Sequence, residues 1–203
     1  MYRRVVAVMV ARWMRRTGRE RGAVMVEMAL VLPLLLLLVI GAIEFGLLFH
    51  ERLTVASAAS SAARTGATMG IREEADYAIL QALEAGLYNQ VDPAVIIRVD
   101  IFKADPVSGA KTGQYDRYLY QPLAASCKWS PCPDVDEDGP VGTWVPSSRD
   151  TTLDDGGGGL DVLGVEIIYH HTAVSGFIPG IDRDLTERAL VRLEPGVFEA
   201  SGG

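Results

Sequence analysis

A glutamate stands at the start of a long apolar stretch, and a glycine lies five residues before it. A carboxylate at the edge of a hydrophobic helix is costly unless a positive charge lies nearby. If the chain is cut after Gly22, the new α-amine of Ala23 is protonated near neutral pH and lies one helical turn from Glu27. Glu27 can then pair with this amine or with the amine of an adjacent subunit. The alternative is an uncut chain in which Glu27 faces the membrane interface.

The chain contains two cysteines, Cys127 and Cys132, separated by Lys-Trp-Ser-Pro. In an oxidising compartment, two cysteines at this spacing favour a short-loop disulfide. A zinc site is less favoured, because His50, His170 and His171 are scattered and the last two would point to opposite faces of a strand. The cysteines are therefore predicted to form a disulfide.

Alternate aspartates follow the cysteines. Asp134, Asp136 and Asp138 precede Gly139 in the pattern that begins a calcium loop, where carboxylates converge on the ion and glycine permits the turn. The match is incomplete, because position twelve of the loop is Val145 and not the glutamate of an EF-hand. Calcium is one interpretation and a solvated acidic turn is the other. No other cofactor is predicted.

Signatures of common enzymes are missing from the sequence. The run from Gly109 to Thr112 lacks the second glycine that precedes the lysine of a P-loop. The glycines at 156–159 precede a predicted strand and not a helix, so they do not form a phosphate-binding turn. There is no Gly-x-Ser-x-Gly nucleophile motif. We predict that the protein is not an enzyme.

The element that must position Glu27 is an apolar helix. Between Met28 and Phe49 there are fifteen Leu, Ile, Val or Phe residues, which together favour the bilayer centre by about 5 to 9 kcal/mol. Glu44 opposes this by at most about 3 kcal/mol, and it is predicted to reach toward headgroups or to pair with another subunit. The stretch is about 33 Å long as a helix, enough to cross the hydrocarbon core. The sequence therefore predicts a transmembrane helix over residues 23–50.

Charge sets the orientation of this helix. Residues 1–22 hold seven arginines and one glutamate, a net charge of +6, whereas the rest of the chain carries −13. Basic residues beside a membrane segment stay on the cytoplasmic side, so residues 1–22 are predicted to be a cytoplasmic leader and residues 51–203 an exported domain. The acidic exported part disfavours nucleic-acid binding. These features predict a single-pass protein of the inner (cytoplasmic) membrane, in contact with lipid.

The junction resembles a known family. Gly-x-x-x-x-Glu after a basic leader and before an apolar helix is similar to type IV prepilins. The longer string Arg-Gly-Ala-x-x-Val-Glu-x-Ala-Leu-Val-Leu-Pro-Leu-Leu-Leu-Leu, residues 21–37, resembles the TadE-like minor pilins of tight-adherence systems. Ile-Glu-Phe-Gly at residues 43–46 extends the resemblance, which covers about 50 residues. The segments 165–169 and 192–195 look like the family's closing strands, and the middle of the chain matches nothing.

The resemblance implies that a membrane-embedded aspartic prepilin peptidase cuts between Gly22 and Ala23, which makes Glu27 the fifth mature residue. It also implies a minor pilin or pseudopilin that takes part in pilus assembly. The implied partners are the peptidase, other pilins, an inner-membrane assembly platform and a secretion ATPase. Two features depart from the family pattern. Met28 stands where the family often has Phe, and the leader is long, so translation could instead begin at Met14.

A different class of protein has the same basic residues and apolar helix. An unprocessed membrane-anchored binding module, in which calcium could regulate a surface contact, is the alternative to a pilin. It predicts an intact amino end, whereas the pilin predicts the loss of residues 1–22. An anchored enzyme is a third hypothesis, but it requires a pocket of converging polar groups that the sequence does not reveal.

The elements beyond the membrane are predicted from periodicity. Small residues at 56–63 continue the first helix, where they either let helix backbones approach closely or merely fill a wet surface. Gly66 and Gly70 weaken or end that helix. Apolar residues then repeat at helical spacing and predict a second, amphipathic helix that ends before Asp92. They are Ile71, Ala75, Ile79, Leu83 and Leu87.

Strands are predicted at 95–102, 162–174 and 185–193, where β-branched and aromatic residues are frequent. Residues 104–160 are rich in glycine and proline and are predicted to be a loop-rich insertion or a short inserted hairpin. The predicted fold class is α+β and pilin-like. A long N-terminal transmembrane helix extends into a small domain, where a second helix packs with a short antiparallel sheet.

Overall fold

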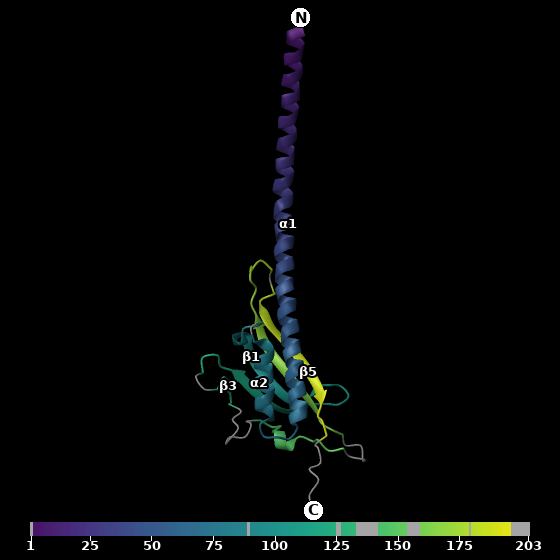
Figure 1. The fold of residues 1–203 in the computed structure, drawn as a ribbon, viewed down its shortest axis with the longest axis vertical. Helices are drawn as coiled ribbons and strands as arrows, with labels where there is room; N and C mark the ends of the chain where they lie inside the picture. The colour runs from purple at the N-terminus through teal and green to yellow at the C-terminus, as the bar shows by residue number, and fades with distance from the viewer. Residues whose placement is uncertain are drawn as a thin grey trace, which may run out of the picture. The chain divides into compact units, whose positions relative to one another are not determined.

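The computed structural model describes residues 2–88, 90–124, 127–132, 142–153, 159–178 and 180–195, with side chains from Gly22 onward. The chain divides into two compact units, residues 1–46 and residues 47–203. One helix, α1 (Tyr2–Met69), contributes to both units. The second unit, here called the C-terminal domain, holds a second helix and an antiparallel sheet (Figure 1), so the predicted α+β fold is confirmed.

Residues 22–46, here called the apolar segment, are the part of the first unit whose side chains are described. Its large apolar side chains between Val24 and Val39 are each at least 41% exposed. Because they are consecutive on a helix, they surround it on every side. By length and composition, the helix from Gly22 onward is the only described one that could cross a membrane. The predicted apolar helix is confirmed, but α1 begins at Tyr2 and not at residue 23.

Helix α1 continues into the C-terminal domain, as predicted, and ends at Met69. Gly70 follows in the left-handed backbone region with a φ of 58°, and its N–H donates to the carbonyl of Gly66 at 3.0 Å. Glycine is favoured at this position because it has no Cβ to clash in that conformation. Gly66 itself lies inside the helix, so Gly70 alone is the terminating residue.

The second predicted helix is α2 (Ala75–Leu87). Ile79, Leu83 and Leu87 are completely buried, which confirms the amphipathic pattern. Ile71 does not belong to the pattern: it precedes the helix and is 51% exposed. A short 3-10 turn, η1 (Pro93–Val95), leads into the sheet.

The sheet has five strands in the order β3-β2-β1-β4-β5, and every adjacent pair is antiparallel. The predicted strands correspond to β1 (Ile96–Ala104), β4 (Val162–His171) and β5 (Arg183–Arg192). The long β2 (Lys111–Tyr120) and the short β3 (Trp129–Ser130) lie within the insertion, together with a second 3-10 turn, η2 (Pro146–Ser148). The first part of the insertion is therefore a full strand of the sheet.

The prediction of a loop-rich segment over 104–160 missed β2 for a physical reason. Strand prediction depends on the alternation of apolar and polar residues. In β2 the residues that face the helices include Asp116 as well as Tyr118, and both are completely buried. The opposite face of β2 likewise holds one aromatic residue, Tyr115, and one charged residue, Arg117. Apolar and polar residues therefore do not alternate along the strand.

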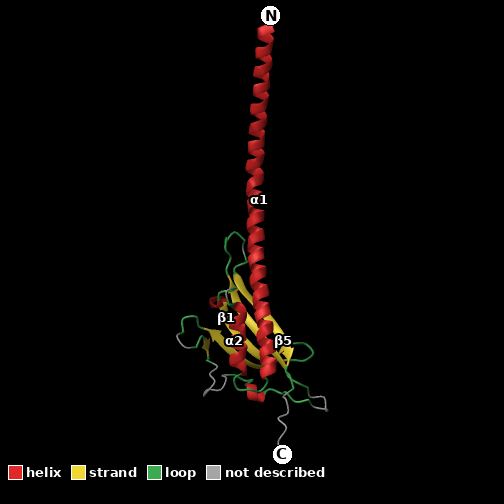
Figure 2. Ribbon diagram, in the orientation of Figure 1, coloured by secondary structure: helices red, strands yellow, loops and turns green. Residues whose placement is uncertain are grey.

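Both helices cover one face of the sheet and lie side by side (Figure 2). The small residues Ala58, Ala59, Ala62 and Ala63 of α1 are buried in the core of the C-terminal domain. A Cβ placed on Gly86 of α2 would lie 2.9 Å from the Cβ of Ala58 and 3.0 Å from its Cα. Of the two predicted roles of the small residues, close approach of helix backbones is correct for the buried alanines, and the approaching helix belongs to the same chain.

Replacing Gly86 should force the two helices apart. Gly86→Ala should lower the free energy of unfolding of the C-terminal domain by about 1 to 3 kcal/mol, because the new methyl group meets the backbone of Ala58. Chemical unfolding of the full chain in detergent, followed by tryptophan fluorescence, measures the change. Gly46→Ala is the matched control, since a Cβ there meets no atom within 4 Å. Equal stabilities of the two variants would contradict the close packing.

Candidate functional site

The junction that the sequence singles out lies on the surface of α1. Gly22, Ala23 and Glu27 are all exposed helical residues. A Cβ placed on Gly22 would meet no atom within 4 Å, so no described part of the chain covers the Gly22–Ala23 bond. Glu27 follows Ala23 by four residues and therefore lies on the same side of the helix. Glycine lowers helix stability by about 1 kcal/mol relative to alanine, which eases the local unwinding that peptide-bond cleavage needs.

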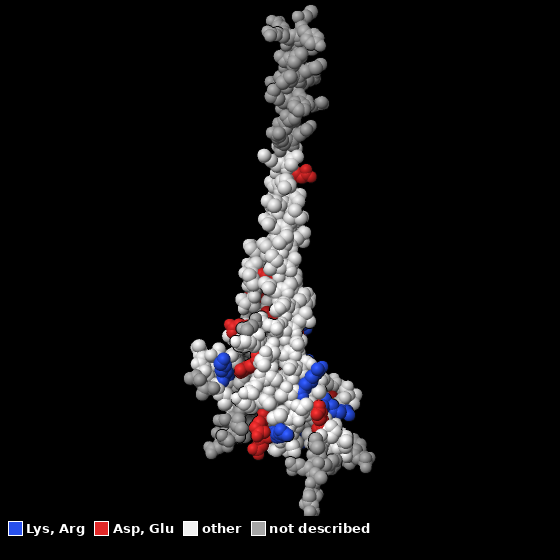
Figure 3. Space-filling view, viewed as in Figure 1, with Lys and Arg blue, Asp and Glu red and all other residues white. Residues whose placement is uncertain are grey.

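The residues that follow this junction are mostly apolar. Between Gly22 and Gly46, Glu27 and Glu44 are the only charged residues, and Figure 3 shows few charged side chains along the described part of the first unit. An exposed carboxylate on such a helix is costly in an apolar environment unless a positive charge or a polar group lies close to it. The structure thus brings together an accessible peptide bond and an accessible carboxylate.

Glu44 differs from the other residues of the apolar segment, because its side chain is only 1% exposed. The two roles predicted for it, reaching toward headgroups and pairing with another subunit, stay predictions. Glu27, in contrast, is exposed.

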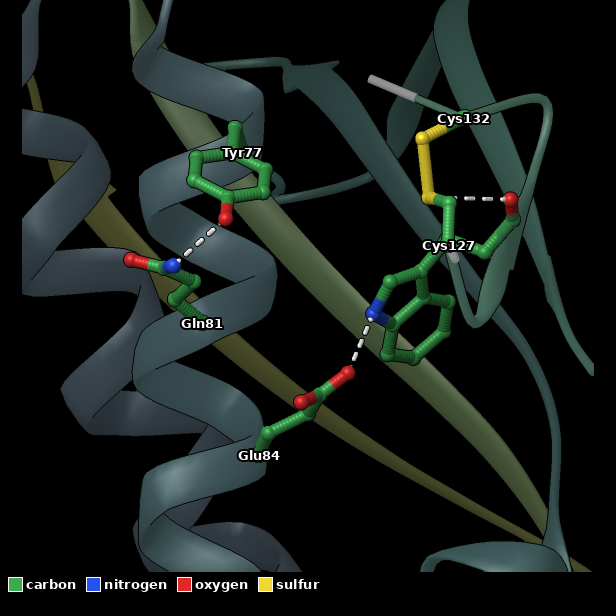
Figure 4. The surroundings of a disulfide bond; sticks show 6 residues. Tyr77, Gln81, Glu84, Cys127 and Cys132 are labelled. Atoms are coloured by element: carbon green, nitrogen blue, oxygen red, sulfur yellow. Dashed lines mark hydrogen bonds between the residues drawn. A yellow bond between two sulfur atoms is a disulfide. The ribbon is translucent and has the colours of Figure 1, made fainter. Parts of the chain in front are cut away.

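Cys127 and Cys132 form a disulfide in the structure. Between them, the indole N–H of Trp129 donates to the Oε1 atom of Glu84 at 2.7 Å, across to helix α2 (Figure 4). The Trp129 ring also packs edge-on against Tyr120, with ring centroids 5.0 Å apart. The disulfide therefore closes a small loop around the residue that fastens β3 to α2. It is a structural bond that the sequence spacing suggested.

The proposed calcium ligands Asp134, Asp136 and Asp138 lie outside the described residues, so calcium binding stays a prediction. Within the described ranges, no three His, Cys, Asp or Glu side chains are grouped to hold a metal ion. The histidine pair of β4 separates as expected for a strand. His170 is exposed and pairs with aspartates, whereas His171 is buried.

A buried ionic cluster, which sequence reasoning missed, joins α2 to β2 and to the segment after η2. The Arg149 guanidinium is completely buried and pairs with Asp76, and it lies 4.0 Å from Asp116. The Tyr118 hydroxyl donates to Asp76 Oδ2 at 2.8 Å. The backbone N–H of Trp144 donates to Asp116 Oδ1 at 3.2 Å. The centroid of the Trp144 ring lies 4.8 Å from the guanidinium carbon of Arg149. Asp76 and Arg149 are 73 residues apart, so no local sequence pattern marks the cluster.

The cluster has two carboxylates for one guanidinium, and this imbalance perturbs its titration. Burial, followed by the negative charge of Asp76, raises the pKa of Asp116 to about 6. Burial and the same carboxylates also raise the pKa of the Tyr118 hydroxyl. All of these residues are at most 4% exposed, so a substrate cannot reach them. The cluster therefore joins elements of the folded core and does not resemble a catalytic site.

A second set of charges lies on the face of the sheet away from the helices. Arg117, Asp100, Glu166 and Arg188 stand in register across four strands. Lys111 bridges the two carboxylates, and its ammonium lies 2.8 Å from Asp100. Burial acts to raise the pKa of Asp100, but hydrogen bonds from Arg117 and Lys111 outweigh it and hold that pKa below its ordinary value. These charges are mutually paired and stabilise the sheet face.

Residues 22–64 match the family model described as TadE-like protein. The match begins at Gly22, includes Glu27 and Glu44, and ends within the part of α1 that packs on the sheet. No curated protein and no solved structure matches the chain.

Asp116 provides a test of the buried ionic cluster. Between about pH 4 and pH 6 the folded chain holds a proton on Asp116 that the unfolded chain has released, so a rise in pH weakens the fold. A shift from 3.8 to about 6 corresponds to a loss on the order of 3 kcal/mol. Asp116→Asn should remove this loss, while its amide oxygen still accepts from Trp144.

The measurement is chemical unfolding of the full chain in detergent at a series of pH values. Asp105→Asn is the control, because Asp105 is exposed and hydrogen bonds from Ser108 lower its pKa. That control should keep the decline of stability between pH 4 and 6. If the curves for the original chain and Asp116→Asn run parallel over this range, Asp116 does not carry the perturbed titration.

Proposed function

We propose that this chain, whose residues 22–64 match the TadE-like family model, is a minor pilin or pseudopilin that takes part in assembling a tight-adherence pilus. The observation that carries this proposal is the position of the match. It starts at Gly22, where a glycine, an accessible peptide bond and a carboxylate one turn later coincide with the beginning of the apolar segment.

The apolar segment anchors the protein in the membrane. Its exposed leucine and valine side chains favour lipid on every side of the helix. The seven arginines of residues 1–22 hold the amino end in the cytoplasm, so the C-terminal domain lies on the other side of the cytoplasmic membrane. The Cys127–Cys132 disulfide supports this orientation, because such bonds persist in oxidising compartments.

Processing removes the leader. A membrane-embedded aspartic prepilin peptidase cuts between Gly22 and Ala23, which are exposed and uncovered on α1. The cut creates an ammonium group at Ala23, four residues before the Glu27 carboxylate. Glu27 then pairs with this ammonium or with that of a neighbouring pilin, which removes the cost of an isolated charge in an apolar environment.

Assembly follows from packing of the processed helix against other pilins at the membrane platform. The apolar segment presents large side chains that lipid or neighbouring helices can cover, whereas the small residues of α1 are already used inside the C-terminal domain. The surface available for helix packing between subunits is therefore residues 23–46, close to Glu27. The second candidate function, an unprocessed membrane-anchored binding module, predicts that residues 1–22 remain.

Mass spectrometry of the chain isolated from its own cells tests the processing step. The original chain should begin at Ala23, and Gly22→Lys should retain the leader, because a large charged side chain replaces the glycine at the cut. Gly22 has open space around it, so the substitution does not disturb the described fold. Gly18→Lys adds the same charge four residues earlier and should still be cut. An original chain that keeps its leader would favour the anchored binding module.

Glu27→Gln tests the role of the carboxylate separately from cleavage. The variant should lose its leader and enter the membrane normally, but its amount in sheared pili should fall about tenfold, as expected if about 1.4 kcal/mol of charge pairing is lost. Quantitative immunoblotting of the pilus and membrane fractions measures the ratio. Glu73→Gln, an exposed site of the C-terminal domain, is the matched control. Equal incorporation of both variants would rule out pairing through Glu27.

A further inference from the structure

The loop that connects β4 to β5 carries exposed apolar side chains. Val174 is 74% exposed and Phe177 is 67% exposed. Between them, Gly176 adopts a φ of 67°, which turns the chain at this tip. An aromatic side chain in water forgoes a favourable burial of roughly 1.5 to 3 kcal/mol. A surface that covers the tip is therefore expected.

The position of the loop follows from the direction of β4. At the start of β4, the side chain of Leu163 lies 3.1 Å from where a Cβ on Gly66 would be, near the end of α1. At the end of β4, the imidazole of His171 pairs with the carboxylate of Glu51. The strand therefore runs antiparallel to α1. The β4–β5 loop leaves the sheet at the end of the C-terminal domain where α1 enters it.

The loop is long enough to reach the predicted membrane boundary. Glu51 lies two residues beyond Phe49, about 3 Å of helical rise. Val174 lies three residues beyond His171, a reach of up to about 10 Å in extended chain. The tip can therefore extend past the level of Phe49, where the predicted transmembrane helix ends. The loop between β1 and β2 leaves the sheet at the opposite end, because Ala104, the last residue of β1, pairs with Val162, the first residue of β4.

The base of the loop is polar, unlike its tip. The Nε2 atom of His170 lies 2.9 Å from Oδ1 of Asp182, and its Nδ1 atom lies 2.7 Å from Oδ1 of Asp184. All three side chains are exposed. An apolar tip above a polar base is the arrangement of a peripheral membrane contact, in which apolar side chains enter about 5 to 10 Å into the boundary between headgroups and acyl chains. Aromatic side chains are common at this depth.

We propose that the β4–β5 loop is a second membrane contact, with Phe177 and Val174 inserted into the interface of the bilayer that α1 spans. The contact rests on the proposed membrane anchoring. Together with α1, it gives the C-terminal domain two attachments to the membrane surface. Tilting of the domain away from the membrane surface is therefore restricted.

Quenching of tryptophan fluorescence by brominated phosphatidylcholine tests this contact in vesicles that contain the full chain. Phe177→Trp keeps an aromatic side chain at the tip and should be quenched by roughly half, close to the value for Leu36→Trp in the apolar segment. Val107→Trp is the matched control, because Val107 is 95% exposed in the loop at the opposite end of the domain. It should not be quenched. The original chain, which contains Trp13, Trp129 and Trp144, is measured in the same vesicles and its signal is subtracted as background.

The other outcomes separate the loop contact from the anchor. Quenching of Leu36→Trp without quenching of Phe177→Trp overturns the loop contact and leaves the anchor in place. Absence of quenching at Leu36 overturns the anchor and the loop contact with it. If Phe177→Trp is protected both from brominated lipid and from acrylamide in water, a protein surface covers the tip, and the lipid contact is wrong.

Discussion

A helix with large apolar side chains on every side must be covered by something other than water. This constraint dominates the first unit, where the side chains from Val24 to Val39 are exposed in the isolated chain. Each leucine or valine loses about 1.5 to 3 kcal/mol of favourable burial if it stays in water. The cost is far larger than the few kcal/mol by which domains are usually stable. A membrane would satisfy the constraint, and under the proposed function neighbouring helices of the same kind would do so in the pilus.

The same helix meets the constraint differently after Leu47. There the side chains become small on one face, and Ala58, Ala59, Ala62 and Ala63 are buried by the rest of the C-terminal domain. Small side chains allow α2 to approach until Gly86 lies against Ala58, with no room for a methyl group between them. Helix α1 is therefore covered by its own domain at one end and depends on its surroundings at the other. Under the proposed function, this division leaves the apolar segment as the surface for assembly.

The parts of the fold that were predicted correctly have strong local patterns. The apolar segment is a long run of mostly one chemical type. The four-residue spacing of Ile79, Leu83 and Leu87 and the β-branched runs of β1 and β4 place apolar residues in the core of the C-terminal domain. The parts that were missed depend on partners far away in the sequence. Asp116 can be buried in β2 because Arg149 reaches it, and nothing within either segment shows that pairing. The charges on the sheet face away from the helices are likewise explained only by the register of four strands. They are Arg117, Asp100, Glu166 and Arg188.

The candidate site was predictable because its residues are local. Gly22, Ala23 and Glu27 lie within two turns of one helix, so their spacing alone defines their relative positions. Glu44, in the same helix, shows the limit of this reasoning. Its burial does not follow from helical spacing.

Under the proposed processing, the cut changes the electrostatics of the amino end as well as its length. Before the cut, a leader with a net charge of +6 resists entry into lipid and holds α1 at the cytoplasmic face. After the cut, the end of the helix carries one ammonium and one carboxylate, four residues apart and without net charge. A neutral pair can move along the membrane normal and pack among other helices at much lower cost. One bond cleavage thus converts a fixed anchor into a helix that can leave the bilayer, as incorporation into a pilus requires.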